Sequence, residues 1–270
     1  MVRMNLQEGR AFAEDLARQA AQTALSYTDD IQVERKSDGS PVTQVDRAIQ
    51  KAIVEAVART YPEHALIGEE TIENAATLPA PADAEYCWVV DPLDGTRNFV
   101  RGFPLTATSI ALLRGGRPVL GVVREHRTGW QCSAVVGEGA SCNGQPARVS
   151  NHPIDHDILV AVPSGRHQPI LPIIRRWVDK YVLRNVGSTS MHMVYVASGA
   201  VDGAFCYECK LWDIAAGALI VEEAGGRCTD LKGQPIFPLD VAGYTNQDLP
   251  FVAASGDIFD ELLSELSVIG

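Results

Sequence analysis

The sequence predicts an α+β protein built from layers of helix against sheet. Apolar residues recur at helical spacing through most of the first 60 residues, and short apolar or alternating runs typical of strands follow up to residue 136. After about residue 150, strand and helix patterns alternate. We expect two parts, residues 1–150 and 151–270, with a boundary near residue 150.

The elements of the first part follow from apolar spacing. Helices are expected over residues 5–27 and about 43–60, joined by a turn-rich link at 36–41. The proline-rich stretch 78–81 is expected to be an exposed loop. Strands are expected at 86–90, 107–113, 119–123 and 131–136.

The elements of the second part alternate in type. Strands are expected at residues 158–162 and 181–186. Helices are expected at 169–178, 190–198, 214–223 and 258–266.

Charge and hydropathy exclude several classes of protein. The formal net charge of -11 argues against a nucleic-acid-binding surface, because phosphate backbones require a basic footprint. No apolar run reaches the roughly 18–20 residues needed to cross a bilayer, and residues 1–27 lack the apolar centre of a signal peptide. We therefore expect a cytoplasmic protein that binds neither nucleic acid nor membrane.

The cysteines are few and scattered, so we expect six reduced thiols, mostly buried. They are Cys87, Cys132, Cys142, Cys206, Cys209 and Cys228. Cys206 and Cys209 form a CxxC, but without a second ligand pair this motif is weak support for zinc or redox chemistry.

Asp91 and Asp94 carry the strongest chemical signal. An apolar strand ends at Asp91, and Asp94 follows three residues later across an expected tight turn. Two carboxylates this close repel each other unless a cation lies between them, and hard oxygen ligands favour magnesium or manganese over zinc. Gly95 allows close approach to a ligand, its amide and that of Thr96 could donate to phosphate, and the Thr96 hydroxyl could hold an attacking water. The alternative is a plain exposed turn.

Two further acidic clusters favour a metal site over an exposed turn. Glu69 and Glu70 follow the apolar segment 65–67, at the end of an element. Asp213 lies at the start of an apolar helix, where it could reach a metal in a cleft. The alternative for Asp213 is an ordinary helix N-cap.

These segments together resemble the inositol monophosphatase family of lithium-sensitive, metal-dependent phosphatases. Residues 68–70 are similar to its GEE element, residues 88–99 to its WxxDPxDGTxNF element, and residues 212–226 to its WDxAAG…EAGG element. Asn143-Gly144 and Gly187-Ser188 are also family-like. The resemblance covers nearly the whole chain.

The resemblance implies a layered αβαβα sandwich, a homodimer, and two or three Mg²⁺ ions, or Mn²⁺ as a substitute, in a cleft between the two parts. It implies that Glu69, Asp91 and the Leu93 carbonyl hold one ion, that Asp91, Asp94 and Asp213 hold a second, and that Glu69 touches a weaker third. Thr96, backed by Asp46, would orient and help activate the attacking water, and with Glu69 these are the expected catalytic residues. The expected substrate contacts are Asp94, Gly95, Thr96, Gly187, Ser188 and Glu208.

The reaction expected from the resemblance is phosphate release from a small phosphorylated metabolite: inositol 1-phosphate or a related polyol or sugar phosphate. Histidinol phosphate is the alternative, followed by fructose bisphosphate and phosphoadenosine phosphate. A regulatory binding protein on the same fold is the non-enzyme alternative, although every metal carboxylate is present.

Substrate choice depends on the segment before Asp213. Many related inositol and histidinol phosphatases place a glutamate seven residues before this aspartate, whereas this chain has Cys206 there. If the segment is extended, Glu208 shares a face with Cys206 and could replace the missing acid. The alternative is a solvent-facing glutamate. Lys36 could approach the cleft, but a solvated surface lysine is the favoured interpretation.

Overall fold

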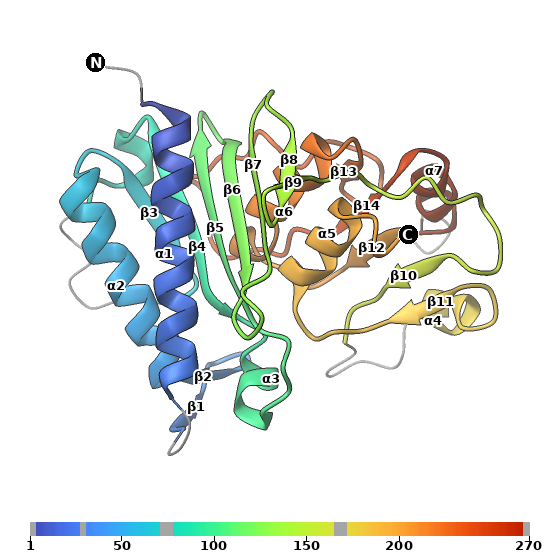
Figure 1. Ribbon diagram of the computed structural model, residues 1–270, viewed down its shortest axis with the longest axis horizontal. Helices are drawn as coiled ribbons and strands as arrows, with labels where there is room; N and C mark the ends of the chain where they lie inside the picture. The colour runs from blue at the N-terminus through green and yellow to red at the C-terminus, as the bar shows by residue number, and fades with distance from the viewer. Residues whose placement is uncertain (1–3, 28–30, 71–77, 165–171, 267–270) are drawn as a thin grey trace.

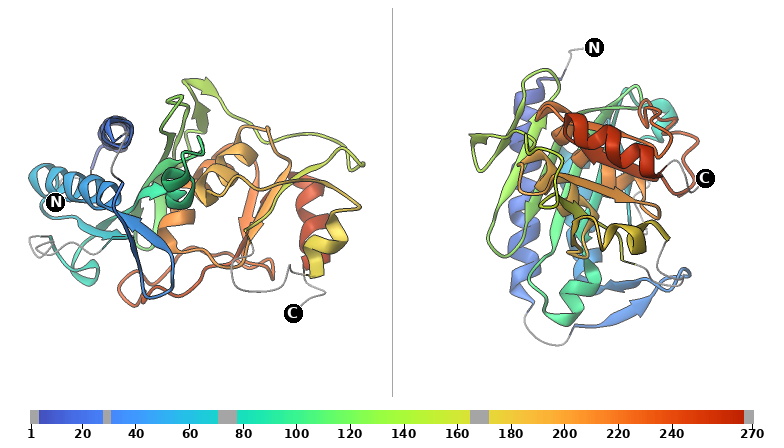
Figure 2. Two further views of the ribbon diagram at one scale, coloured as in Figure 1. Left: turned by 90° about the horizontal axis from the view of Figure 1, so that it is seen from below. Right: turned by 90° about the vertical axis from the view of Figure 1, so that its right-hand side faces the viewer.

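Five layers alternate between helices and sheets in the computed structural model, which describes residues 4–27, 31–70, 78–164 and 172–266. Helices α1 (Leu6–Ser26) and α2 (Gln44–Thr60) form the first layer, and α5 (Thr189–Ala197) and α6 (Leu211–Glu223) lie between the two large sheets (Figures 1 and 2). Helices α4 (Pro172–Trp177) and α7 (Gly256–Leu266) cover the outer face of the second sheet. The expected αβαβα sandwich is confirmed.

The first large sheet has seven strands in sequence order, β3 to β9. Strand β3 runs parallel to β4, and each later strand is antiparallel to its predecessor. The strands are β3 (Ala65–Gly68), β4 (Tyr86–Asp94), β5 (Ala107–Arg114), β6 (Arg117–Glu125), β7 (Gln131–Val135), β8 (Ala140–Cys142) and β9 (Gln145–Pro146).

Both faces of β4 are covered, which explains why this strand is buried along its whole length. Successive strand residues point to opposite faces. Trp88 and Val90 therefore pack against α1 and α2, while Val89 joins the core formed with α5 and α6. A continuous apolar run is the sequence pattern that such a two-sided environment requires.

The second large sheet has five strands in the order β11-β10-β12-β14-β13, with β10 parallel to both β11 and β12. The other two pairs are antiparallel. The strands are β10 (Leu159–Ala161), β11 (Val182–Arg184), β12 (Gly203–Cys206), β13 (Arg227–Thr229) and β14 (Phe251–Ala254). A separate hairpin pairs β1 (Val33–Arg35) with β2 (Pro41–Thr43).

The long helices, the strands β4 to β7 and the strands β10 and β11 lie where apolar spacing predicts them. The buried strands β12 and β14 and the neighbouring β13 were not predicted, and the short elements differ. Helix α6 begins at Leu211 rather than 214, so Asp213 lies inside its first turn and Lys210 is the N-cap. Residues 36–41 lead into β2, residues 81–83 form a short 3₁₀ turn (η2, Pro81–Asp83), and α3 (Thr96–Arg101) follows β4. The first three residues of the helix expected at 169–178 lie outside the described ranges.

The prediction of six reduced cysteines is wrong for one pair. Cys132 and Cys142 lie opposite each other on antiparallel strands β7 and β8, and they form a disulfide. The other four cysteines are free and buried, as expected: Cys87, Cys206, Cys209 and Cys228.

Helices α5 and α6 belong to the C-terminal part of the sequence, yet they fill one core with both sheets. Val89 of β4, Ile214 of α6 and Phe251 of β14 are members of the same buried cluster. The boundary near residue 150 stays a prediction. Across the part of the chain that the structure describes, every helix is too short or too polar to cross a membrane.

Gly121 sets the distance between β6 and α6. A Cβ atom at this position would lie 2.8 Å from the Ala216 carbonyl oxygen and 3.0 Å from the Ala216 Cα. These are backbone atoms of a buried helix, so they cannot move aside as the tip of a side chain can. The residue at 121 therefore decides how closely the helix that carries Asp213 approaches the first sheet.

Gly121→Ala should lower the free energy of unfolding by about 1–3 kcal/mol, because overpacking displaces the backbone of α6. Gly256→Ala is the matched control, since a Cβ there would meet nothing within 4 Å. The control should change stability by less than about 1 kcal/mol. Urea unfolding measures both variants, and equal stabilities would contradict the close approach.

Candidate metal centre and active site

An irregularity in β4 brings Asp91 and Asp94 to one place. Asp91 pairs with Ser109 of β5 and Asp94 with Ala107, so three steps on β4 match two on β5. In a regular strand, residues three apart point to opposite faces, and one extra residue in a bulge restores them to the same side. The tight turn expected between these aspartates is therefore wrong: a bulged strand takes its place.

Asp213 reaches the same place from the first turn of α6. Its Oδ2 accepts a hydrogen bond from the Lys210 backbone N–H at 2.6 Å, which fixes the carboxylate at the start of the helix. Asp91, Asp94 and Asp213 each offer one carboxylate oxygen, and these oxygens lie within 4.8 Å of one another. The three aspartates that the family resemblance assigns to one ion thus converge.

Glu69 joins this group through β3. The Glu69 backbone N–H donates to the Val90 carbonyl at 3.1 Å, which extends the β3–β4 pairing by one residue. Its carboxyl group consequently lies within hydrogen-bonding reach of Asp91. We use the name acidic cluster for Glu69, Asp91, Asp94 and Asp213.

Asp94 is held by the N-terminus of α5. Its Oδ2 accepts hydrogen bonds from the Ser188 hydroxyl at 2.8 Å, the Ser190 hydroxyl at 2.6 Å and the Ser190 backbone N–H at 2.7 Å. Backbone N–H groups in the first turn of a helix have no partner within the helix, so they suit a carboxylate. The start of α5 thereby fixes the orientation of the Asp94 carboxylate.

Burial sets the electrostatics of the acidic cluster. It raises the pKa values of Asp91 and Asp213 well above the ordinary range, and the neighbouring carboxylates raise them further. Burial also raises the pKa values of Glu69 and Asp94. Keeping these four carboxyl groups ionised costs free energy unless a positive charge lies beside them. Hard oxygen donors of this kind suit Mg²⁺ or Mn²⁺. The donor set therefore fits a divalent cation.

Thr96 and Asp46 lie beside the cluster in a hydrogen-bonded chain. The Thr96 hydroxyl is 3.0 Å from Asp46 Oδ1 and 3.1 Å from the Leu93 carbonyl oxygen. The other Asp46 oxygen accepts from the Thr43 backbone N–H at 2.9 Å and from the Thr43 hydroxyl. Because Thr43 and Asp46 form the capping box of α2, the helix start fixes this carboxylate.

Two glycines let separate segments meet next to Asp94. Gly95 adopts a φ of 91°, and a Cβ there would lie 3.0 Å from the Leu105 carbonyl oxygen. Gly187 adopts a φ of 71°, and a Cβ there would lie 2.9 Å from the Asn98 side chain. Asn98 donates to the carbonyls of Leu105 and Val186, both at 2.7 Å. Gly95, Gly187 and Ser188 thus surround Asp94, and their contact with a substrate stays a prediction.

The segment before Asp213 is not extended as far as the sequence argument requires. Strand β12 ends at Cys206, and Tyr207 and Glu208 form a bend. Cys206 is buried and Glu208 is exposed, so strand alternation does not place them on one face. A role for Glu208 in binding substrate stays a prediction without that support.

Lys36 is the clearest correction. The favoured interpretation was a solvated surface lysine, yet its Nζ lies 2.6 Å from Glu69 Oε1 and also contacts Glu70 Oε1. The hairpin between β1 and β2 directs this side chain toward the end of β3. Position in the sequence indicated proximity to Asp46 but gave no measure of burial.

Sequence reasoning also missed Ser190 and Asn98. Ser190 lies two residues after the expected contact Ser188, at a helix start where a second hydroxyl and free N–H groups are a usable signal. Asn98 belongs to the same motif as Asp91, but its tie to the Val186 carbonyl joins segments 88 residues apart. No local pattern reveals such a contact.

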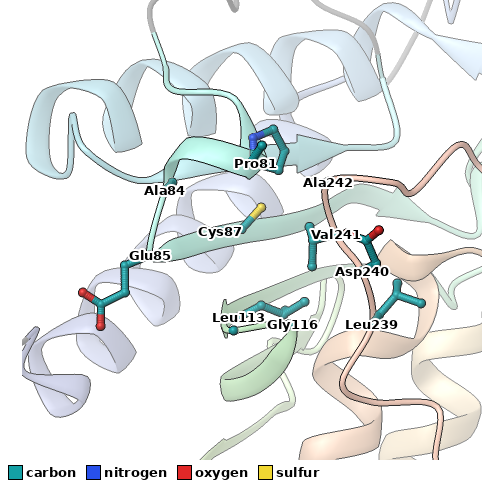
Figure 3. A pocket seen from close by; sticks show the side chains of 12 residues that line it. Pro81, Ala84, Glu85, Cys87, Leu113, Gly116, Leu239, Asp240, Val241 and Ala242 are labelled. Atoms are coloured by element: carbon teal, nitrogen blue, oxygen red, sulfur yellow. The ribbon is translucent and has the colours of Figure 1, made fainter.

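A pocket of about 240 Å³ lies elsewhere, beside the start of β4 (Figure 3). Cys87 of β4, Leu113 of β5 and the segment 239–242 line it, so β4 has the acidic cluster at one end and this hollow at the other. The group of three metal-capable side chains found within the described residues is Asp91, Asp94 and Asp213, and it includes neither cysteine of the CxxC.

Comparison with known proteins agrees with this geometry. Residues 5–267 match the family model described as "Inositol monophosphatase family". The chain belongs to the inositol monophosphatase family. Nus factor SuhB of Pasteurella multocida (strain Pm70) is 38% identical over 211 residues, which cover 76% of this chain and 77% of that protein. Inositol monophosphatase 1 of Bos taurus is 33% identical over 240 residues, which cover 85% and 86%.

Solved structures agree as well. The IMPase of Thermotoga maritima has a TM-score of 0.82 at 28% identity, covering 96% of each chain. The extragenic suppressor protein suhB of Bartonella henselae has a TM-score of 0.82 at 29% identity, covering 95% of this chain and 97% of that one. This member of the inositol monophosphatase family therefore keeps the family fold over 95–96% of its length.

Metal-free protein should reveal the electrostatic cost of Asp213. Its raised pKa means that the folded state binds the proton more tightly than the unfolded state does. Its stabilising contribution is therefore present at low pH and is lost as the pH rises from about 4 through the folded pKa. In chelator, Asp213→Asn should melt near the parent temperature at about pH 4 and above it at about pH 7.

Thermal unfolding of both proteins across this pH series measures the difference. Saturating Mg²⁺ is the control condition. There the parent should melt at the higher temperature, because it binds the ion more tightly than the variant. A difference that does not change with pH in chelator would contradict the account.

Proposed function

We propose that this chain is a magnesium-dependent phosphomonoesterase that releases phosphate from a small phosphorylated metabolite. The observation that carries the proposal is the convergence of three buried or half-buried aspartate carboxylates within 4.8 Å, with Glu69 beside them. When Mg²⁺ is bound in such a site, it polarises the phosphoryl group and lowers the pKa of water. On the basis of the family resemblance, we also propose that lithium inhibits the protein and that the protein forms a homodimer.

Ion binding is assigned to the acidic cluster and to the Leu93 carbonyl. Asp91 is central, because it neighbours Glu69 on one side and belongs to the group with Asp94 and Asp213 on the other. We propose that the site binds two or three Mg²⁺ ions, for which Mn²⁺ can substitute. Gly95, Thr96, Gly187 and Ser188 would line the phosphate end of the site.

Thr96 is the proposed water-positioning residue. When its hydroxyl donates to Asp46 Oδ1, its oxygen can accept a hydrogen bond from water beside the acidic cluster. Asp46 is buried, and burial raises its pKa despite the hydrogen bonds from Thr43, which suits a group that shares or accepts a proton. The pair would thus orient a nucleophilic water and assist its deprotonation.

Inositol 1-phosphate or a related polyol or sugar phosphate is the proposed substrate. The relative named inositol monophosphatase 1, at 33% identity, supports this class. Cys206 lies where many relatives have a glutamate, so histidinol phosphate stays the alternative, with fructose bisphosphate and phosphoadenosine phosphate behind it. A phosphate-release screen across these compounds separates them.

A second candidate is a partner-binding role. Several relatives at 35–38% identity carry the name Nus factor SuhB, which is not the name of a phosphatase. Because all the metal carboxylates are present and converge, we favour hydrolysis as the main role. Metal-dependent turnover in the screen supports that choice, and its absence on every substrate would favour the second candidate.

Removing divalent ions should abolish phosphate release, and adding Mg²⁺ should restore it. Asp94→Asn should slow turnover about a hundredfold to several thousandfold, which corresponds to roughly 3–5 kcal/mol of transition-state stabilisation. Asp257→Asn on the exposed start of α7 is the matched control and should behave like the parent. Near-normal turnover of Asp94→Asn in saturating Mg²⁺ would remove this residue from the metal site.

Thr96→Ala should lower kcat by roughly a hundredfold or more with little change in KM, because positioning of the water is lost while substrate contacts remain. Thr96→Ser keeps the hydroxyl and should retain most of the activity. Steady-state kinetics on the best substrate from the screen measure both. If the serine variant is as slow as the alanine variant, the hydroxyl is not the group that matters.

A further inference from the structure

Lys36 brings a positive charge into the Glu69 end of the acidic cluster. Its ammonium lies 2.6 Å from Glu69 Oε1 and contacts Glu70 Oε1, and the Glu70 side chain is only 8% exposed. Burial alone would lower the pKa of Lys36, but the two glutamates outweigh it and raise that pKa. The ammonium is therefore charged and partly shielded from water.

The backbone holds Lys36 in this position. The Lys36 backbone N–H donates to the Ser40 carbonyl and the Gly39 N–H donates to the Lys36 carbonyl, both at 2.9 Å. The Asp38 carboxylate accepts from the Ser40 backbone N–H at 2.8 Å, which closes the same turn. A lysine at a fixed hairpin turn reaches the glutamates from one direction, unlike a surface lysine that samples many conformations.

Glu69 lies between a positively charged neighbour and an acidic one. Glu69 is paired with an ammonium on one side and lies within hydrogen-bonding reach of the Asp91 carboxyl on the other. Without a divalent cation, Lys36 offsets part of the repulsion among these acids. A divalent cation that binds Glu69 would lie close to the ammonium, and like charges at such a distance repel strongly in a partly desolvated site.

We propose that Lys36 is a positioning residue: it is the internal counterion of Glu69 and Glu70, and it competes with a divalent cation for the Glu69 end of the acidic cluster. This inference rests on the proposed function, because it assigns the cluster to metal. It follows that an ion held by Asp94 and Asp213 binds without displacing Lys36, whereas an ion on Glu69 binds more weakly. The chain itself thereby limits how many ions the site holds at a given concentration.

Titration of Mn²⁺ into chelator-stripped protein, followed by calorimetry, tests this without any measurement of turnover. Lys36→Met removes the charge and keeps most of the side-chain length, so it should tighten the weaker Mn²⁺ site by about tenfold or more. The metal-free variant should also melt at a lower temperature than the parent, because the counterion is gone. Its gain in melting temperature on adding Mn²⁺ should exceed that of the parent.

Two further variants serve as controls. Lys36→Arg keeps the charge and should bind Mn²⁺ much as the parent does. Lys51→Met removes an exposed lysine that pairs with Glu55 on α2, and it should change neither affinity nor the metal-induced gain. If Lys36→Met does not fold, Lys36→Gln provides the same comparison with a polar, uncharged side chain.

Unchanged or weaker Mn²⁺ binding in the uncharged Lys36 variants would overturn the competition. So would an equal loss of melting temperature with and without metal, which is the signature of a purely structural lysine. A parent protein that binds no Mn²⁺ would overturn the proposed function together with this inference. Binding by the parent with no tightening in the variants would overturn this inference alone.

Discussion

Repulsion among buried carboxylates is the constraint on which the rest of this site depends. Glu69 follows β3, Asp91 and Asp94 belong to β4, and Asp213 belongs to α6. Burial raises the pKa of all four carboxyl groups. Gathering such groups does not increase the stability of the fold, because burying an apolar residue at any of the four positions would cost less free energy. Their convergence fits a site that a cation would complete.

The fold meets this constraint with fixed dipoles and one ammonium. The start of α5 donates three hydrogen bonds to Asp94 through Ser188 and Ser190, and the Lys210 N–H at the start of α6 holds Asp213. Both helices lie between the two sheets, so their N-termini can reach the bulged end of β4. These donors fix both carboxylates through Oδ2.

Much of this could be predicted from local sequence, because local physics decides it. Apolar spacing located the long helices and β4 to β7 but missed β12 and β14, and the motif around Asp91 indicated two carboxylates of the acidic cluster. The predictions that failed concern features set by pairing between strands. The bulge depends on the register between β4 and β5, and the Cys132–Cys142 disulfide depends on the register between β7 and β8. Lys36 was misjudged for the same reason, since its partners lie 33 and 34 residues away, just after β3.

The central claim is that a divalent cation binds among Asp91, Asp94 and Asp213. The most direct measurement is anomalous diffraction from crystals of this protein grown or soaked with Mn²⁺. The account predicts an anomalous peak within coordination distance of carboxylate oxygens from all three aspartates, and a weaker or concentration-dependent peak on the Glu69 side. Well-ordered carboxylates with no anomalous peak among them at saturating Mn²⁺, or a peak only at another site, would contradict it.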